Sequence, residues 1–222
     1  MIRSLALVTG ASRGIGKAIA ARLRKGEIEV LAPTRDELNL STDESIEAYV
    51  ARLGEPIDIL INDAGINILG ASDEFKDDDL LMTIQVNLTA PMKLAKALIP
   101  GMKKRRYGRI INIISIWSLV SKPRRITYST SKAALNGFTR SLAVELAPFN
   151  ILVNAIAPGY VNTELTRQNN SPTEIQAISD MIPLKRLAEP EEIAELVYFL
   201  GSDKNTYVTG QIITIDGGFT CL

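Results

Sequence analysis

Tyr128 and Lys132 are the residues of this sequence whose types and spacing most readily suggest chemistry. They stand four positions apart in the stretch YSTSK, and residues at i and i+4 lie on the same side of an α-helix. A free tyrosine has a pKa of about 10, and a neighbouring lysine ammonium favours the phenolate and lowers that pKa. The pair could act as general acid and base in a chain that contains no histidine. An amphipathic helix with both residues on one face is the ordinary alternative.

A glycine-rich turn, TGASRGIG from Thr9 to Gly16, is the second candidate site. Its glycines allow a tight turn and a close approach of the backbone to a pyrophosphate, and the following helix offers free N–H groups and a positive dipole end. Glycines at such positions also occur in turns that have only a structural role. Here the turn follows a predicted strand and precedes a predicted helix, which favours phosphate binding.

The elements that position these residues alternate along the whole chain. Apolar segments of strand length lie at 4–9, 28–32, 57–62, 109–115, 151–157 and 211–216, with a very short one possible at 38–40. Their high Val, Ile and Leu content is typical of a parallel sheet covered on both faces, and the helical segments between them predict right-handed βαβ units. No repeat or linker divides the chain. We predict one α/β domain over residues 1–222, a Rossmann-type doubly wound parallel sheet of about seven strands.

The connection after the second predicted strand is unusually short. Only residues 33–37 separate it from 38–40, whereas parallel strands normally need a helix-length crossover. The helix between strands two and three is therefore predicted to be missing. Residues 38–40 must then form a stub beside the second strand, or no strand at all.

The G-x-x-x-G-x-G turn and the YSTSK stretch together resemble the short-chain dehydrogenase/reductase family over essentially the whole chain. The resemblance implies hydride transfer between a nicotinamide and a carbonyl carbon. Tyr128 would give the carbonyl oxygen its proton, or its phenolate would remove the proton from an alcohol. Lys132 would also hold the nicotinamide ribose hydroxyls.

Two further residues match catalytic positions of the family. Ser115 ends the stretch RIINIIS, 13 residues before Tyr128, and its hydroxyl can donate to a substrate carbonyl oxygen. Asn87, in MTIQVNLTAP, matches the helix asparagine that holds a water in a proton relay toward the lysine. The alternatives are a strand-end serine bonded to backbone and an ordinary buried asparagine.

The same resemblance implies a set of cofactor contacts. They are Thr9, Gly10, Ser12, Arg13, Gly14, Ile15, Gly16, Arg35, Asn39, Leu40, Asn62, Ala64, Gly65, Tyr128, Lys132, Pro158, Gly159, Val161 and Thr163. The NDAG segment at 62–65 differs from the family's usual Asn-Asn-Ala-Gly at Asp63. We expect little functional consequence from that difference.

The end of the second strand bears on the choice of nicotinamide cofactor. NAD-binding folds usually place an acidic residue there to hold the ribose 2′-hydroxyl, but residues 32–34 are Ala, Pro and Thr. Arg35 follows them and Arg13 lies in the glycine-rich turn, and two guanidinium groups suit a 2′-phosphate. We therefore predict that NADP(H) is favoured over NAD(H). Solvated arginines, with Asp36 as the ribose ligand, are the alternative.

Two segments are expected to shape the substrate side: residues 116–127, and a lid over 163–190. The first contains Trp117, which could stack on a substrate ring or pack in the wall, and a basic cluster of Lys122, Arg124 and Arg125. The cluster would suit an anionic or carrier-linked carbonyl or alcohol substrate. An exposed loop or a subunit contact is the alternative.

Within the family, the chain looks most like 3-oxoacyl-[acyl-carrier-protein] reductases. The stretch MKKRRYGRIINI, with Arg106, resembles the segment that bears one of their carrier-docking arginines. A second docking arginine is expected at 147–150, where this chain has Ala-Pro-Phe-Asn. A ketoreductase of a sugar, nucleotide-sugar or polysaccharide pathway is the alternative. A non-catalytic NADP-binding regulator is a third, although such proteins usually lose the tyrosine or the lysine.

The composition limits the remaining classes. The 25 Lys and Arg residues balance the 25 Asp and Glu residues, which gives no electrostatic case for nucleic acid or a membrane surface. With Cys221 as the single cysteine and no histidine, no intramolecular disulfide and no usual zinc site can be assembled. No bilayer-length apolar run or signal peptide is visible, so a cytoplasmic protein is expected. The C-terminal IDGGF resembles segments that pack across subunits, which implies a homodimer or homotetramer.

Overall fold

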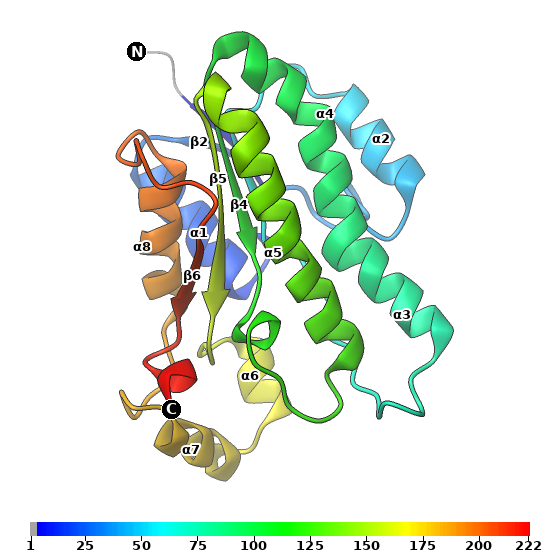
Figure 1. The fold of residues 1–222 in the computed structure, drawn as a ribbon, viewed down its shortest axis with the longest axis vertical. Coiled ribbons are helices and arrows are strands. Elements are labelled where there is room, and N and C mark those ends of the chain that lie inside the picture. Colours follow the sequence, from blue (N-terminus) through cyan, green and yellow to red (C-terminus); the bar gives the residue numbers. More distant parts are fainter. Residues whose placement is uncertain (1–3) are drawn as a thin grey trace.

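The computed structural model describes residues 4–222 and contains a parallel sheet with helices on both faces (Figure 1). The strand order is β2-β1-β3-β4-β5-β6, and every neighbouring pair is parallel. The strands are β1 (Leu5–Val8), β2 (Glu29–Leu31), β3 (Ile59–Asn62), β4 (Gly108–Ile113), β5 (Ile151–Pro158) and β6 (Ile212–Ile215). The predicted doubly wound α/β class is confirmed, and each strand falls within three residues of its predicted range.

Helices cover the sheet in two layers (Figure 1). One face carries α2 (Asp43–Ala51), α4 (Ala90–Arg105) and α5 (Ile126–Leu146), with α3 (Asp77–Ile84) leading into α4; the other carries α1 (Gly14–Lys25) and α8 (Pro190–Gly201). Short helices α6 (Glu164–Asn169) and α7 (Pro172–Met181) lie beyond the end of the sheet. Within residues 4–222, none of these helices is both long and apolar enough to cross a membrane.

Strand β1 shows how the core forms on both faces at once. Leu5 and Leu7 pack with α2, α4 and α5, whereas Ala6 and Val8 pack with α1 and α8. Successive side chains of a strand point to opposite faces, so a sheet covered on both sides must be apolar at every position. Burying one large aliphatic side chain stabilises the fold by about 1.5–3 kcal/mol. The continuous apolar strands of the sequence follow from this double coverage.

Residues 38–40 do not form a strand, so the described sheet has six strands rather than about seven. The backbone N–H groups of Glu37 and Leu38 both donate to the Thr34 carbonyl, which makes a tight turn directly after β2. Leu38 and Leu40 are buried in the core beside α2 instead of pairing with β2. The predicted loss of the helix between β2 and this segment agrees with the structure, because residues 32–42 contain no helix.

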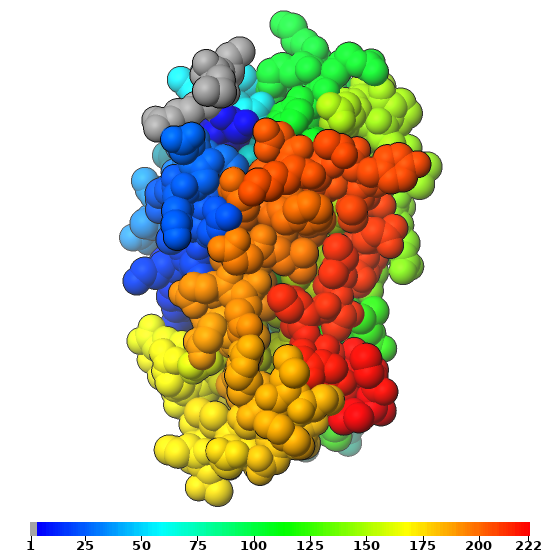
Figure 2. Space-filling view, turned by 90° about the vertical axis from the view of Figure 1, so that its left-hand side faces the viewer, coloured from blue at the N-terminus to red at the C-terminus, as the bar shows by residue number. Residues whose placement is uncertain are grey.

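The carboxyl ends of the parallel strands all meet at one edge of the sheet, which is where ligands bind in such folds. The loops after β1, β3, β4 and β5 gather there, and α6 and α7 lie beyond them (Figure 1). Figure 2 shows the yellow and orange segment that contains α6 and α7 forming this end of the molecule, with the red C-terminal residues beside it.

Candidate active site

Ser115, Tyr128 and Lys132 come together where β4 ends. Ser115 lies two residues beyond β4, and its Oγ accepts a hydrogen bond from the Trp117 N–H at 3.2 Å. Tyr128 and Lys132 lie in the first two turns of α5, and the Lys132 ammonium is 5.8 Å from the centre of the Tyr128 ring. Lys132 is 3% exposed and donates to the Ile113 carbonyl at 2.8 Å. Helix α5 therefore directs both side chains toward the end of one central strand.

Burial raises the pKa of Tyr128 above its usual value. A hydrogen bond with Ser115 and the charge of Arg125 act in the opposite direction, but they do not outweigh burial. The net change in the pKa of Tyr128 is thus opposite to the lowering expected from a nearby lysine, because burial has the largest effect. The phenol stays protonated near neutral pH, which suits a proton donor.

Asp63 links the lysine to the glycine-rich turn. Burial raises the pKa of Asp63 to about 7, against the opposing effects of the Lys132 charge and the Gly16 backbone N–H. Burial also lowers the pKa of Lys132 to about 8, and the Asp63 charge opposes that change. Two groups that titrate near neutrality thus lie side by side. In the sequence, the departure from Asn-Asn-Ala-Gly at Asp63 is the signal for this pair, although periodicity does not show its proximity to Lys132.

A π-helical turn (Gln85–Thr89) joins α3 to α4 without a break and carries Asn87 at its centre. A π turn has one more residue than an α turn and is frequent at functional sites. Asn87 is buried: its Oδ1 accepts from the Ile66 N–H at 2.8 Å, and its Nδ2 donates to Ser131 Oγ at 3.0 Å. The side chain thereby fixes the loop after β3 against α5. No pattern in the sequence indicates the π turn.

Gly65 occupies the space between Asn87 and Lys132. A Cβ built on Gly65 would lie 3.2 Å from Asn87 Oδ1 and 3.3 Å from Lys132 Nζ. Only glycine leaves both polar atoms undisturbed at this point. The amide and the ammonium thus face the same small volume, which is the arrangement that a proton relay toward Lys132 would need.

The glycine-rich turn makes backbone contacts that exclude side chains. Gly10 has φ +73°, and a Cβ there would lie 2.9 Å from the backbone of Ala64. Gly14 has φ +54° and opens α1, and a Cβ on it would lie 3.4 Å from Thr163 Cγ2. The turn therefore meets both the NDAG segment and the loop after β5. Its place between β1 and α1 is as predicted.

The hydroxyl of Thr9 holds the NDAG segment in place. Thr9 Oγ1 accepts from the Asp63 N–H at 3.1 Å and from the Ala64 N–H at 3.2 Å. Asn62, the first residue of that segment, is 2% exposed and donates to Asn112 Oδ1 at 2.9 Å within the sheet. Asn62 therefore ties β3 to β4.

The remaining predicted cofactor residues lie in three settings. Ser12, Arg13 and Arg35 are exposed, and no ion pair of either arginine occurs within residues 4–222. Ile15, Leu40 and Val161 contribute to the core, and Asn39 Oδ1 accepts from the Ser41 N–H at 3.1 Å. Pro158 ends β5, and a Cβ on Gly159 would lie 2.7 Å from Asp216 Cβ.

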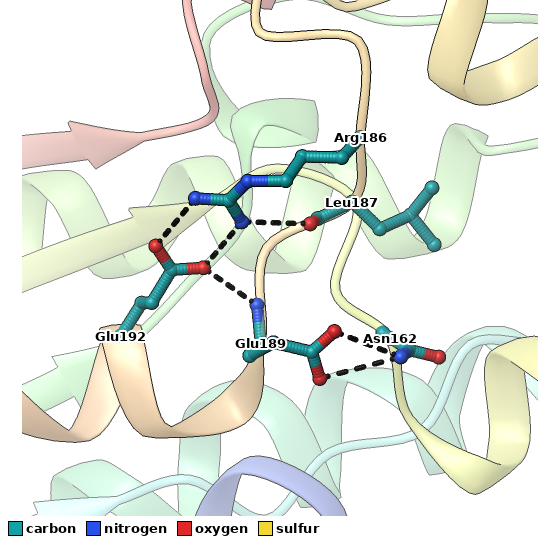
Figure 3. Close-up of polar contacts among 5 residues, drawn as sticks. All are labelled: Asn162, Arg186, Leu187, Glu189 and Glu192. Atoms are coloured by element: carbon teal, nitrogen blue, oxygen red, sulfur yellow. Dashed lines mark hydrogen bonds and ion pairs between the residues drawn. The ribbon is translucent and has the colours of Figure 1, made fainter.

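The segment predicted as a lid leaves and rejoins the fold at one point. The Asn162 N–H donates to the Ala188 carbonyl at 2.8 Å, and the Ala188 N–H donates to the Tyr160 carbonyl at 3.0 Å. Figure 3 shows the side chains that close this base: Asn162 donates to both Glu189 oxygens, and Arg186 pairs with Glu192. Helices α6 and α7 lie between the two ends, so the segment is a loop with a pinned base.

An aromatic cluster lies beside the pinned base. The ring centres of Trp117, Tyr160 and Phe219 are 5.6–6.1 Å apart in edge-to-face contacts. Lys122 Nζ is 5.4 Å from the centre of the Trp117 ring and 5.7 Å from that of Tyr160. A cavity of about 800 Å³ is lined by this cluster and by Met181. Sequence reasoning assigned a substrate-side role to Trp117 but not to Tyr160 or Phe219, although each of the two directly follows a glycine.

Comparisons with known proteins agree with this geometry. Residues 36–220 match the model of the family described as enoyl-(acyl carrier protein) reductase. The 3-oxoacyl-[acyl-carrier-protein] reductase of Pseudomonas aeruginosa is 40% identical over 239 residues, and the alignment covers 96% of each chain.

Two solved structures are similar over nearly their whole length. A proposed NAD(P)-dependent gluconate 5-dehydrogenase from Beutenbergia cavernae, with NADP bound, superposes with a TM-score of 0.93 at 33% identity, covering 99% of this chain and 97% of that one. A 4-hydroxyisoleucine dehydrogenase in complex with NADH gives a TM-score of 0.93 at 30% identity, covering 99% of each chain.

Proposed function

This chain belongs to the short-chain dehydrogenase/reductase family and is an NAD(P)-dependent oxidoreductase, and from that premise we propose that it uses NADPH to reduce a ketone to a secondary alcohol. The observation that carries the proposal is the meeting of Ser115, Tyr128 and Lys132 at the end of β4. A glycine-rich turn with a free helix N-terminus lies at the same edge of the sheet.

In the proposed reaction, bound NADPH supplies the hydride to the carbonyl carbon. The Ser115 hydroxyl donates to the carbonyl oxygen and stabilises the charge that develops there. Tyr128 gives its phenolic proton to the same oxygen, which completes the alcohol. Lys132, with a pKa of about 8, can return a proton toward the phenolate, and Asn87 would hold the water that links Lys132 to solvent.

The residues present fit NADPH. Arg13 and Arg35 are exposed and free of ion pairs within residues 4–222, so both guanidinium groups can turn to a 2′-phosphate. Glu37, the acid nearest the end of β2 after Asp36, accepts from the Thr34 N–H at 2.7 Å and is occupied within its own turn. The similar structures hold either NADP or NADH, so a titration with both cofactors is the test.

For the substrate we propose a 3-oxoacyl thioester or a similar carbonyl compound. Similarity to the P. aeruginosa reductase supports it. Arg106, at the position that resembles a carrier-docking arginine, is exposed but donates to the Pro148 carbonyl at 2.9 Å, and Phe149 stands near the place of the second. Similarity to a proposed gluconate 5-dehydrogenase favours the alternative, a ketoreductase of a sugar or polysaccharide precursor pathway.

The deciding experiment is NADPH oxidation with an acetoacetyl thioester and with a keto-sugar nucleotide, assayed side by side. Faster turnover of the thioester supports the proposal, and faster turnover of the keto sugar supports the alternative. Oxidation of neither, with tight NADPH binding, would favour the non-catalytic regulator.

We also propose that the protein works as a homodimer or homotetramer. Strand β6 lies at the edge of the described sheet, and Tyr207, just before it, is 95% exposed. An open strand edge with exposed large side chains beside it is commonly covered in an assembly. Light scattering of the purified protein would measure the mass.

A further inference from the structure

A second cavity, of about 470 Å³, opens at the N-terminus of α5. It lies between the loop after β3 and the segment that joins Ser115 to α5. Its polar lining residues are Ser72, Ser121, Lys122, Arg124, Arg125, Ser129 and Thr130, and no acidic residue lines it. Three cationic and four hydroxyl residues thus line one volume, which far exceeds the roughly 30 Å³ of a water molecule.

The cations of this cavity are not neutralised. Within residues 4–222, none of Lys122, Arg124 and Arg125 forms an ion pair. The Nε atom of Arg125 is buried without any hydrogen-bond partner. Burial of a charged donor without a partner is unfavourable, so an acceptor that reached the Arg125 guanidinium would be stabilised there.

Helix α5 adds to the positive potential. It is 21 residues long and begins at Ile126, and Arg125 at its N-cap makes no side-chain capping bond. The first N–H groups of such a helix lack partners within the helix, and the helix dipole favours negative charge there. The charges of the side chains and of the helix therefore act in the same direction.

The cavity walls are held by the backbone. Gly70 forms an isolated parallel bridge with Arg125, and its N–H donates to the Arg124 carbonyl at 3.3 Å. Arg124 has φ +67°, which a non-glycine residue adopts only when its surroundings require it. Ser121 Oγ and Ser129 Oγ are 3.2 Å apart. The two loops are thereby fixed against each other around the cavity.

We propose that this cavity binds an oxyanion, a phosphate or carboxylate, that the substrate carries at a distance from its reacting carbonyl. Ser129, which lines the cavity, is the residue after Tyr128 in α5. The cavity also shares Ser121 and Lys122 with the aromatic cavity, so a substrate chain can pass along the rings to the anion site. The inference rests on the proposed ketone reduction and assigns its substrate class, a ketone with an anionic group.

Matched ketones test the proposal. Dihydroxyacetone phosphate and dihydroxyacetone differ only in the phosphate, and acetoacetate and methyl acetoacetate differ in the carboxylate charge. We expect kcat/KM to be at least tenfold higher for at least one anionic ketone than for its neutral partner, because a single charged hydrogen bond changes an equilibrium by about tenfold or more. Equal kcat/KM within both pairs would overturn the proposal.

Variants of the cavity residues test whether this cavity causes the preference for anionic ketones. Arg124→Asn removes a charge and keeps a residue that tolerates the left-handed backbone. Lys122→Ala is the second variant. Both should reduce the ratio of anionic to neutral kcat/KM by about tenfold. Arg140→Ala, an exposed arginine on the same helix with no ion pair in the described chain, should keep the wild-type ratio. An equal ratio in all four proteins would contradict the assignment.

A binding measurement tests the anion site independently of the proposed ketone reduction. If no ketone oxidises NADPH, the proposal of ketone reduction is refuted. Calorimetry with dihydroxyacetone phosphate and the NADP⁺-saturated protein would still show whether the cavity binds an anion. Binding that Arg124→Asn weakens about tenfold, and that inorganic phosphate displaces only when in excess, supports it. Absence of binding, or equal affinity for inorganic phosphate alone, contradicts a substrate-borne anion.

Discussion

Two regions at the carboxyl edge of the sheet are built in different ways. The proposed cofactor side, residues 9–16 and 62–65, is backbone packed on backbone: Gly10 meets Ala64, and Thr9 holds the segment through its hydroxyl. The proposed substrate side, residues 116–127 and 163–190, is built from side chains on loops and short helices. A surface where only glycine fits leaves a readable sequence signature, whereas a surface of loop side chains does not.

Charge differs between the two regions as well. On the proposed cofactor side, the charges of Asp63 and Lys132 act on each other's pKa near the glycine-rich turn. On the proposed substrate side, Lys122, Arg124 and Arg125 have no acidic partner within residues 4–222. The first region combines an acid with a base, whereas the second is complementary to an anion. The predictions below test this contrast in order of expected effect.

Removing the phenolic proton should affect chemistry and spare cofactor binding. Tyr128→Phe keeps the ring and should lower kcat about 10²–10⁴-fold, because a positioned acid or base contributes that much. NADPH affinity, measured by fluorescence, should stay within about threefold of wild type. Tyr207→Phe changes a fully exposed phenol and is the matched control. Residual activity of Tyr128→Phe within about tenfold of wild type would remove the assigned role.

The cofactor side should discriminate between NADPH and NADH through Arg35. Arg35→Ala should weaken NADPH binding about 10–100-fold, the value of one or two charged hydrogen bonds, and change NADH binding little. Titration with each cofactor measures both affinities, with Arg140→Ala as the control for lost charge. Equal weakening of the two cofactors would mean that the 2′-phosphate lies elsewhere.

The backbone packing of the cofactor side can be tested at one glycine. Gly10→Ala should lower the free energy of unfolding by about 1–3 kcal/mol, because the residue has positive φ and no space for a Cβ. Urea denaturation measures the change. Gly137→Ala, in α5 with open space around it, should be neutral or stabilise by about 0.5–1 kcal/mol. If both variants unfolded alike, the tight packing at Gly10 would be refuted.

The buried carboxyl predicts a pH dependence of stability. The pKa of Asp63 is raised from 3.8 to about 7, so the native state binds more protons than the unfolded state between these values and wild type loses stability as pH rises through them. Asp63→Asn lacks this loss. The stability of the variant relative to wild type should therefore grow from pH 4 to pH 7 and then level off.

The shift in the pKa of Asp63 limits how much the stability of Asp63→Asn can increase relative to wild type. One pKa unit corresponds to about 1.4 kcal/mol, so the gain is at most about 4 kcal/mol and smaller where solvent screens the carboxylate. Urea unfolding of both proteins at several pH values measures it. A difference that stays constant across this range would show that Asp63 ionises at an ordinary pKa.

The sequence predicted the sheet and the position of the glycine-rich turn well, for physical reasons. The strands are apolar at each buried position, and Gly10, Gly14 and Gly65 stand where a Cβ would collide or the backbone turns left-handed. The spacing of Tyr128 and Lys132 is local, so helix geometry alone places them together. These features need no knowledge of distant parts of the chain.

The remaining features depend on contacts between distant residues. The pKa of Tyr128 is set by burial, and Lys132 is held by the carbonyl of Ile113, which periodicity does not show. The π turn at Asn87 and the meeting of Trp117 with Tyr160 and Phe219 likewise arise only in the assembled fold. Residues 38–40 look like a strand because their leucines are buried, but they pack on α2 rather than on β2.

One measurement tests the proposed ketone reduction most directly. The purified protein would be titrated with NADPH by fluorescence, and an acetoacetyl thioester and the matched anionic ketones would then be added to the complex. We predict saturable NADPH binding, followed by loss of NADPH fluorescence as the ketone is reduced, and no such loss in Tyr128→Phe. Tight NADPH binding, with no change in NADPH fluorescence when any of these ketones is added, would contradict the proposed ketone reduction.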